Sequence, residues 1–475
     1  MSDIEKIPLK SSIEAGDSTS RSQKEDSAVC VQNVLDRLGF GKYHFFLTVG
    51  VTIAVITEGA EVAIVSLITY ILEEVWDLSS FQVGVMGGVI FVGMSFGLLV
   101  VATWGDDWGR LPVLKFTYIG ALALRLLSAL MPEFWSFVTV RAFTGFVQAM
   151  SMPTAVALAA ESCPSKQRGS FIMLIIMTYG VGQLYVIGLA ALLTPDLDGG
   201  MWQLLIVLVS LPILIGILCM FTKVVESPLF SSKRGYSINT IESLDHIAQS
   251  NNRPFLSERE RMGVCLVNPP TERGSQKFKF LFDEKHRTTT VLLMIQWTLT
   301  FFSYFGFFYL LPKLLEEIDT EIDTLVLMAI IICIEISIVA SFVFLIEMPS
   351  VGRKGTMKIC YTSSIVINLL CIFIEANGFR IPAIMVICGL NHVACSVLWP
   401  YTSEVYETHI REMATAFVNA VGRGLSFFSP LLFGVFLELS IWVPFAFMLF
   451  LSGCLMAIAL MLPIETRGMS LDTNP

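Results

Sequence analysis

The segment that decides the fold is the polar stretch at residues 223–287, KVVESPLFSSKRGYSINTIESLDHIAQSNNRPFLSERERMGVCLVNPPTERGSQKFKFLFDEKHR. It is the only extended polar stretch between residues 43 and 463. About six hydrophobic runs precede it and about six follow it, each near the ~20 residues that a helix needs to cross a bilayer. Two matching hydrophobic halves joined by one charged loop favour a polytopic membrane transporter.

The composition excludes an ordinary soluble domain. The 475 residues are 54% hydrophobic and only 15% charged, whereas soluble domains carry about 25% charged residues. A water-soluble core could not cover so many apolar runs, so lipid must surround most of the chain. We therefore expect an all-α membrane protein with twelve transmembrane helices.

The hydrophobic pattern also predicts the domain organisation. It consists of a cytoplasmic tail with a short amphipathic helix (1–42), a six-helix bundle (43–222), a central cytoplasmic loop (223–287), a second six-helix bundle (288–463) and a cytoplasmic tail (464–475). Within the central loop, Ile241, Leu244, Ile247 and Ala248 fit one face of a helix.

Charge distribution predicts the topology. Acidic residues gather in alternate loops, and basic residues gather in the others, where Arg110, Arg168, Arg353 and Arg411 lie. Because cytoplasmic loops carry the excess of Lys and Arg, both termini and the central loop are expected in the cytosol.

Two pairs of loops repeat the same charges. Glu161 precedes Arg168 by the same spacing with which Glu404 precedes Arg411. The loop D-D-W-G-R, with Asp106, Gly109 and Arg110, corresponds to V-G-R-K, with Arg353. Matched loops at matched positions indicate a duplicated six-span unit, as in two-half transporters.

These loop residues are candidates for a cytoplasmic gate. A carboxylate at the end of one helix can face an arginine of a neighbour, or the positive N-terminus of another helix. Such contacts would form a bistable element that breaks when the inner side opens. The alternative is that they are topology signals and surface ion pairs, worth about 0–1 kcal/mol each.

Several motifs resemble the major facilitator superfamily. They are D-x-x-G-R at 106–110, R-x-x-x-G at 141–145, E-S-P at 226–228 and P-I-E-T-R-G-x-x-L at 463–471. L-G-F-G-K-Y at 38–43, S-Y-F-G at 303–306 and Y-T-S-E-V-Y-E-T at 401–408 are similar to the synaptic-vesicle-2-related proteins and their orphan organic-ion-transporter relatives. The resemblance implies the major facilitator fold and adds Glu226 and Glu465 to the candidate gate.

The chain also departs from that family. The usual first glycine of the loop after span 2 is Ala102, and Pro349 stands where an acid is expected after span 8. The double glutamine that sugar porters carry in span 7 is represented by Gln296 alone. These departures put the second half of the gate and a sugar substrate in doubt.

Charges inside the spans are candidates for proton coupling. Glu58 and Glu61 share one face of span 1, and an intramembrane carboxylate is by default a functional hypothesis. Resemblance to proton-coupled sugar symporters implies that Glu61 takes up a proton and that Arg141 of span 4 lowers its proton affinity on contact. The alternative is a permanent structural ion pair.

Polar and aromatic residues of the second half are candidates for the substrate cavity. Arg423 lies in G-R-G of span 11 and could bind a substrate anion. Gln296, Tyr304, Trp399 and Tyr401 could line the cavity, where aromatic rings would suit a planar or cationic ligand. The same aromatics could equally form a packed, lipid-facing surface. His392 is interpreted as a helix–helix hydrogen-bonding residue.

The sequence therefore predicts a secondary-active transporter of a small organic ion, which works by alternating access and is coupled to protons. A facilitative sugar or metabolite uniporter and a non-transporting vesicle or surface binding protein are the alternatives. The expected partners are a small solute, protons and the bilayer, with a monomeric state. No nucleic acid, cofactor, metal site or enzymatic activity is expected. The expected location is the plasma membrane or an intracellular vesicle.

Overall fold

The computed structural model describes residues 31–165, 168–197, 199–265, 280–318, 322–346, 351–374, 376–406 and 410–466. Within these ranges the chain forms helices and turns, with no strand. Twelve helical spans in the described ranges are long and apolar enough to cross a membrane. The expected fold class, an all-α membrane protein with twelve such helices, is confirmed.

The first bundle contains six spans, three of which are interrupted. Its helices are α2 (Lys42–Val75), α3 (Ser80–Trp108), α4 (Arg110–Ala129), α5 (Phe134–Ala149), α6 (Ser151–Ser162), α7 (Arg168–Met177), α8 (Tyr179–Leu193), α9 (Trp202–Val209) and α10 (Leu211–Thr222). Pro153 and Pro212 lie in the first turns of α6 and α10. Proline is tolerated there because those backbone N–H groups have no partner within the helix.

The second bundle also contains six spans, of which only the fifth is interrupted within the described residues. Its helices are α15 (Arg287–Glu317), α16 (Thr324–Ile346), α17 (Gly352–Phe373), α18 (Asn377–Val405), α19 (Arg411–Leu425), α20 (Phe428–Leu439) and α21 (Val443–Met461). Helix α18 begins at Asn377 and contains Pro382 five residues further on. The helix accommodates that proline close to its first turn.

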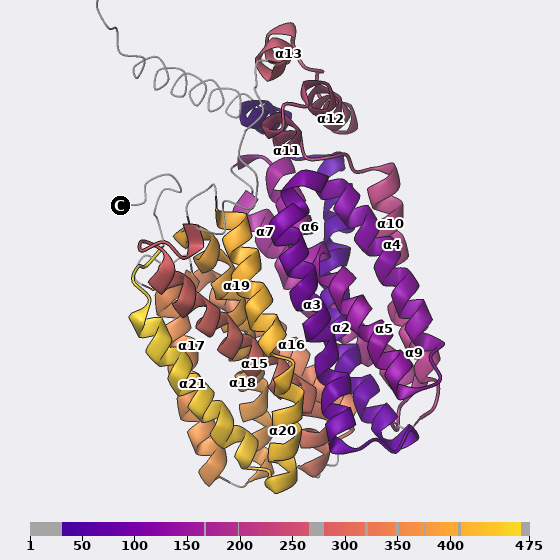
Figure 1. The fold of residues 1–475 in the computed structure, drawn as a ribbon, viewed down its shortest axis with the longest axis vertical. Helices are drawn as coiled ribbons and strands as arrows, with labels where there is room; N and C mark the ends of the chain where they lie inside the picture. Colours follow the sequence, from indigo (N-terminus) through magenta and orange to yellow (C-terminus); the bar gives the residue numbers. More distant parts are fainter. Residues whose placement is uncertain are drawn as a thin grey trace, which may run out of the picture.

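The central loop forms short helices over one end of the first bundle. They are α11 (Pro228–Lys233), α12 (Ser237–Ser250) and α13 (Glu258–Cys265). Leu244, Ile247 and Ala248 of α12 are buried, as its periodicity predicted. Figure 1 shows α11–α13 above the first bundle. We call this end of the molecule the loop side, and the other end the opposite side.

The two bundles pack side by side, with α3 against α19 and α20, and α8 against α16 (Figure 1). Helix α2 lies innermost, because 89% of its most apolar 18-residue stretch is buried, whereas 39% of the corresponding stretch of α17 is buried. Gly59 of α2 and Gly182 of α8 allow the two backbones to approach, since a Cβ at either would strike the other helix's carbonyl. This close packing places the acids of α2 deep inside the molecule.

Candidate functional site

A cavity of about 40 Å³ lies between the bundles, which is room for about three water molecules. The first bundle lines it with Glu58, Met152, Ile176 and Tyr179, and the second with Phe301, Tyr304, Phe305, His392, Cys395, Ser396, Trp399 and Arg423. Its walls are therefore mostly apolar or aromatic, with a few polar groups, as is typical of sites for small organic molecules.

One ion pair crosses this cavity from bundle to bundle. The Arg423 guanidinium of α19 donates to the Glu58 carboxylate of α2, and their side chains are 5% and 2% exposed. Asn419 accepts from Nε of Arg423 at 3.0 Å, and the Phe301 ring lies 5.2 Å from the guanidinium carbon. Glu58 was predicted for coupling and Arg423 for substrate binding, and the structure brings the two together.

A second buried cluster lies within the first bundle. Glu61 is 2.6 Å from Arg141 and 2.6 Å from Arg125, and all three side chains are nearly inaccessible. Arg125 also donates to the Thr57 carbonyl at 2.9 Å. The contact between Glu61 and Arg141 matches the sequence expectation, whereas the participation of Arg125 was missed. A role for these residues in proton coupling remains a prediction.

In a third buried cluster His392 forms the helix–helix hydrogen bond that the sequence predicted for it, but sequence reasoning missed its partner Glu335. Nδ1 of His392 on α18 lies 2.5 Å from Oε1 of Glu335 on α16, and the Tyr304 hydroxyl donates to the same oxygen at 3.0 Å. An acid and a histidine inside hydrophobic spans were the available signal. Their separation of 57 residues in the chain hid the pairing.

The predicted cavity residues divide into two groups. Tyr304, Trp399 and Arg423 line the cavity. Gln296 is instead buried outside the cavity lining, and its amide donates to the Tyr361 hydroxyl at 2.6 Å. Tyr401 lies near the end of α18 and donates to the Ile464 carbonyl at 2.9 Å. Tyr401 is therefore placed in helix-end packing, because it lies beyond the cavity residues on the same helix.

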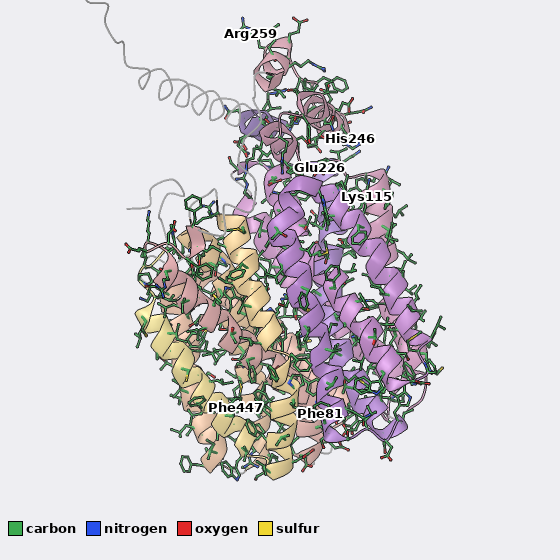
Figure 2. The ribbon with its side chains drawn as sticks, in the orientation of Figure 1. Phe81, Lys115, Glu226, His246, Arg259 and Phe447 are labelled. Carbon is green, nitrogen blue, oxygen red and sulfur yellow. The ribbon has the colours of Figure 1, made fainter. Side chains whose placement is uncertain are left out.

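The loop side of the first bundle carries a compact charge cluster. Arg110 pairs with Glu161 at 3.2 Å. Glu226 accepts the backbone N–H groups of Arg110 at 3.1 Å and Leu111 at 3.2 Å, at the N-terminus of α4. Burial raises the pKa of the Glu226 carboxyl, against hydrogen bonds from Ser227, Leu111 and Arg110 that lower it. Figure 2 shows Glu226 between the first bundle and α11–α13.

The second bundle repeats the cluster. Arg353 pairs with Glu404 at 3.1 Å, again across 51 positions in the chain, as for Arg110 and Glu161. Glu465 accepts the backbone N–H groups of Arg353 at 2.8 Å and Lys354 at 2.9 Å, at the N-terminus of α17. We call the two sets, Arg110–Glu161–Glu226 and Arg353–Glu404–Glu465, the loop-side clusters.

Both clusters join helices of a single bundle. In this conformation they therefore do not tie the two bundles to each other. Their role in gating remains a prediction.

The other gate candidates lie differently. Arg168 donates to the Gln32 side chain at 2.5 Å, and Nε of Arg411 donates to the Tyr406 carbonyl at 3.4 Å. The arginines that pair with Glu161 and Glu404 in the described part of the chain are therefore Arg110 and Arg353. Asp106 belongs to α3, but its side chain lies outside the described residues. Gly109 has a φ of +87°, which favours glycine.

Away from the cavity, further polar contacts join the two bundles on the opposite side. Lys313 of α15 pairs with Glu73 of α2 at 2.5 Å. Tyr70 of α2 donates to Glu316 at 2.6 Å. Ser80 of α3 donates to Glu438 of α20 at 2.8 Å. Sequence reasoning noted acidic residues in alternate loops but did not identify these pairs, because the partners come from opposite halves of the chain.

Among the described residues, no group of three His, Cys, Asp or Glu side chains could hold a metal ion.

Comparison with known proteins supports this architecture. Residues 47–430 match the model of the Major Facilitator Superfamily. Synaptic vesicle 2-related protein of Bos taurus is 27% identical over 472 residues, which cover 94% of this chain and 83% of that protein. Putative transporter SVOPL of Homo sapiens is 24% identical, and the alignment covers 94% of this chain and 94% of that protein.

Among solved structures, the inward-open xylose transporter XylE from E. coli aligns with a TM-score of 0.70 at 16% identity. The alignment covers 90% of this chain and 98% of that chain. At this identity the likeness concerns the fold alone. The family and these structural neighbours are transporters, and the family model matches most of the sequence. This chain therefore belongs to the Major Facilitator Superfamily.

Proposed function

We propose that this protein is a secondary-active transporter that moves a small organic anion together with a proton. The observation that carries the proposal is the ion pair between Glu58 and Arg423, which spans the two bundles at the cavity. An ionised Glu58 and a carboxylate or other anionic group of the solute would compete for the same guanidinium. Protonation of Glu58 would release Arg423 to bind the solute, which links the two ligands.

The geometry favours Glu58 over Glu61 as the coupling carboxylate. Glu58 lines the cavity and faces one arginine from the other bundle. Glu61 faces two arginines of its own bundle and does not line the cavity. In this proposal, Glu61 with Arg125 and Arg141 keeps α2, α4 and α5 together.

Charge distribution supports a cytoplasmic location for the loop side and both termini, because the basic loops lie there. On the opposite side, contacts join the two bundles, whereas the loop-side clusters are confined to single bundles. The structure would therefore correspond to a state closed toward the outside. The similarity to synaptic vesicle 2-related proteins favours a vesicle membrane as the location.

The test is uptake of a panel of small organic acids by proteoliposomes at outside pH 6.0 and pH 7.5. Glu58→Gln should keep exchange of labelled solute but lose accumulation driven by the proton gradient. Arg423→Gln should lose both activities. Glu61→Gln is the matched control, and it should lower stability more than it alters the pH dependence.

Equal accumulation by wild type and Glu58→Gln would end the coupling mechanism. If only Glu61→Gln removed pH-driven accumulation, coupling would belong to Glu61. Flux of neutral sugars without pH dependence would instead identify a facilitative uniporter.

A further inference from the structure

The cluster around Glu335 lies at the cavity but takes no part in the pairing of Glu58 with Arg423. Glu335 has no exposed surface. Its Oε1 contacts Nδ1 of His392 at 2.5 Å and accepts from the Tyr304 hydroxyl at 3.0 Å. The Gln183 amide of α8 donates to the same tyrosine oxygen at 3.3 Å. Helices α15, α16 and α18 therefore meet at this carboxylate, and α8 reaches it only through the Tyr304 hydroxyl.

The surroundings of Glu335 contain few charges. The groups that face it are the phenols of Tyr179 and Tyr304 and the thiols of Cys388 and Cys395. Across the cavity, Glu58 and Arg423 are paired with each other. Among the described residues no lysine or arginine forms a salt bridge with Glu335, so His392 is its candidate for a balancing charge.

Charge counting then indicates a bound proton. A carboxylate beside a neutral imidazole carries one net negative charge, which is costly inside a membrane protein. One added proton makes the pair neutral, whether it lies on the ring or on the carboxyl group. The close contact between Nδ1 and Oε1 allows either arrangement.

The ring has a distinct second nitrogen. Nδ1 is engaged by Glu335, so Nε2 is the ring nitrogen available to the cavity that His392 lines. With the added proton, Nε2 carries a hydrogen in both arrangements, since either the ring is an imidazolium or Nδ1 accepts from the carboxylic acid. Without it, Nδ1–H donates to the carboxylate and Nε2 is a bare acceptor.

We propose that Glu335 and His392 form a second proton-binding site of the cavity, which holds one proton and presents the Nε2–H of His392 to the solute. This N–H would donate to an anionic group, and loss of the proton would turn the donor into an acceptor. The inference deepens the proposed function, because it rests on the cavity being a transport site and adds a second carrier of protons in the other bundle.

The experiment is ¹⁵N solid-state NMR of histidine-labelled protein in lipid nanodiscs at pH 7.5, without added solute. The chain has 5 histidines, and His392→Gln assigns the signal. The expected result is a protonated Nε2 on His392. A neutral ring with a proton on Nδ1 and a bare Nε2 would overturn the proposal.

Two further variants sharpen the result. Glu335→Gln removes the negative charge, so His392 should be a neutral ring, and a doubly protonated ring there would overturn the pairing. Tyr304→Phe removes the hydroxyl that donates to Glu335 and accepts from Gln183 but leaves the Glu335–His392 pair in place, so it serves if Glu335→Gln does not fold. Nε2 should stay protonated, and a bare Nε2 would again count against the site. Ser396→Ala, which also alters the cavity lining, is the control and should leave the ring signals unchanged.

The measurement separates this inference from the proposed function. It reads the ring directly and needs no transport. If Glu58→Gln left uptake unchanged, the coupling mechanism at Glu58 would be wrong, but the NMR result would not be affected. A bare Nε2 would end the second site and leave the uptake result standing.

Discussion

The two ends of the molecule use charged side chains in different ways. On the loop side, each cluster joins helices within one bundle, with Arg110 to Glu161 in the first and Arg353 to Glu404 in the second. On the opposite side, Lys313 and Glu73 join one bundle to the other. The difference teaches that the repeated motifs preserve the shape of each bundle, whereas unrepeated residues hold the bundles together in this state.

The largest expected effect concerns the glycines of the loop-side clusters. A Cβ at Gly109 would lie 2.5 Å from Oε2 of Glu226, and one at Gly352 would lie 2.6 Å from the Glu465 carboxyl carbon. Both residues also have positive φ angles, +87° and +64°. Gly109→Val and Gly352→Val should therefore lower the free energy of unfolding by about 3 kcal/mol or more, through strain and loss of the carboxylate contacts. Thermal unfolding in detergent measures this loss.

Gly188→Ala is the control, because a Cβ there meets nothing within 4 Å. It should be neutral or slightly stabilising. If Gly109→Val were as mild as this control, the loop-side cluster would not determine the shape of the first bundle.

The next effect distinguishes the two loop-side clusters. The Arg110 and Glu161 side chains are 9% and 12% exposed, whereas those of Arg353 and Glu404 are 12% and 21% exposed. When one partner of the more buried pair is removed, the arginine that remains is less hydrated than the arginine of the more exposed pair. Glu161→Gln should therefore destabilise by about 2 kcal/mol and Glu404→Gln by about 1 kcal/mol.

Chemical unfolding of each variant measures this order. If Glu404→Gln lost more stability than Glu161→Gln, burial would not determine how much each pair contributes to stability.

A smaller change in stability, but a larger change in conformation, is expected on the opposite side. Lys313 and Glu73 are about one-third exposed, so Lys313→Glu should lower stability by no more than about 1 kcal/mol. Because the pair joins the bundles, repulsion between Glu73 and the new acid should increase opening of this side. The rate at which an impermeant thiol reagent labels Ser66→Cys, beside this contact, measures the opening.

The charge-swapped variant Lys313→Glu with Glu73→Lys is the matched control and should restore slow labelling. Fast labelling of both variants would show that the contact matters for packing and not for its charges.

The smallest effect is a pH dependence on the loop side. Burial alone would raise the pKa of Asp36, but hydrogen bonds from Ser165 and Gln32 and the positive charge of Arg168 together outweigh it, so the pKa is lowered from its ordinary value of 3.8. A lowered pKa means that the contact of Asp36 with Ser165 stabilises the packing of residues 31–38 above pH 3.8. This stabilisation is lost as the pH falls through the pKa of Asp36 in the folded protein. Hydrogen exchange of residues 31–38 should therefore accelerate only below about pH 4. Asp36→Asn should exchange faster at neutral pH and lose this acid dependence.

Much of the fold could be predicted from the sequence. Hydrophobic runs of spanning length and one polar segment predicted twelve helices in two halves, because lipid requires every buried backbone group to be paired within a helix. The repeated loop charges likewise identified Glu161, Glu404, Arg110 and Arg353 as related residues. The pattern did not show that Arg110 and Arg353, not Arg168 and Arg411, are the partners.

The sequence by itself determined the number of spans, the position of the central loop and the presence of acids and arginines inside the spans. Only the tertiary structure decided which of these charges meet. Glu58 pairs with a residue 365 positions away, and Glu335 with one 57 positions away. Helical periodicity is a local property that reports which face of a helix is apolar. Contacts between helices depend on how two bundles pack, and no local pattern records that arrangement.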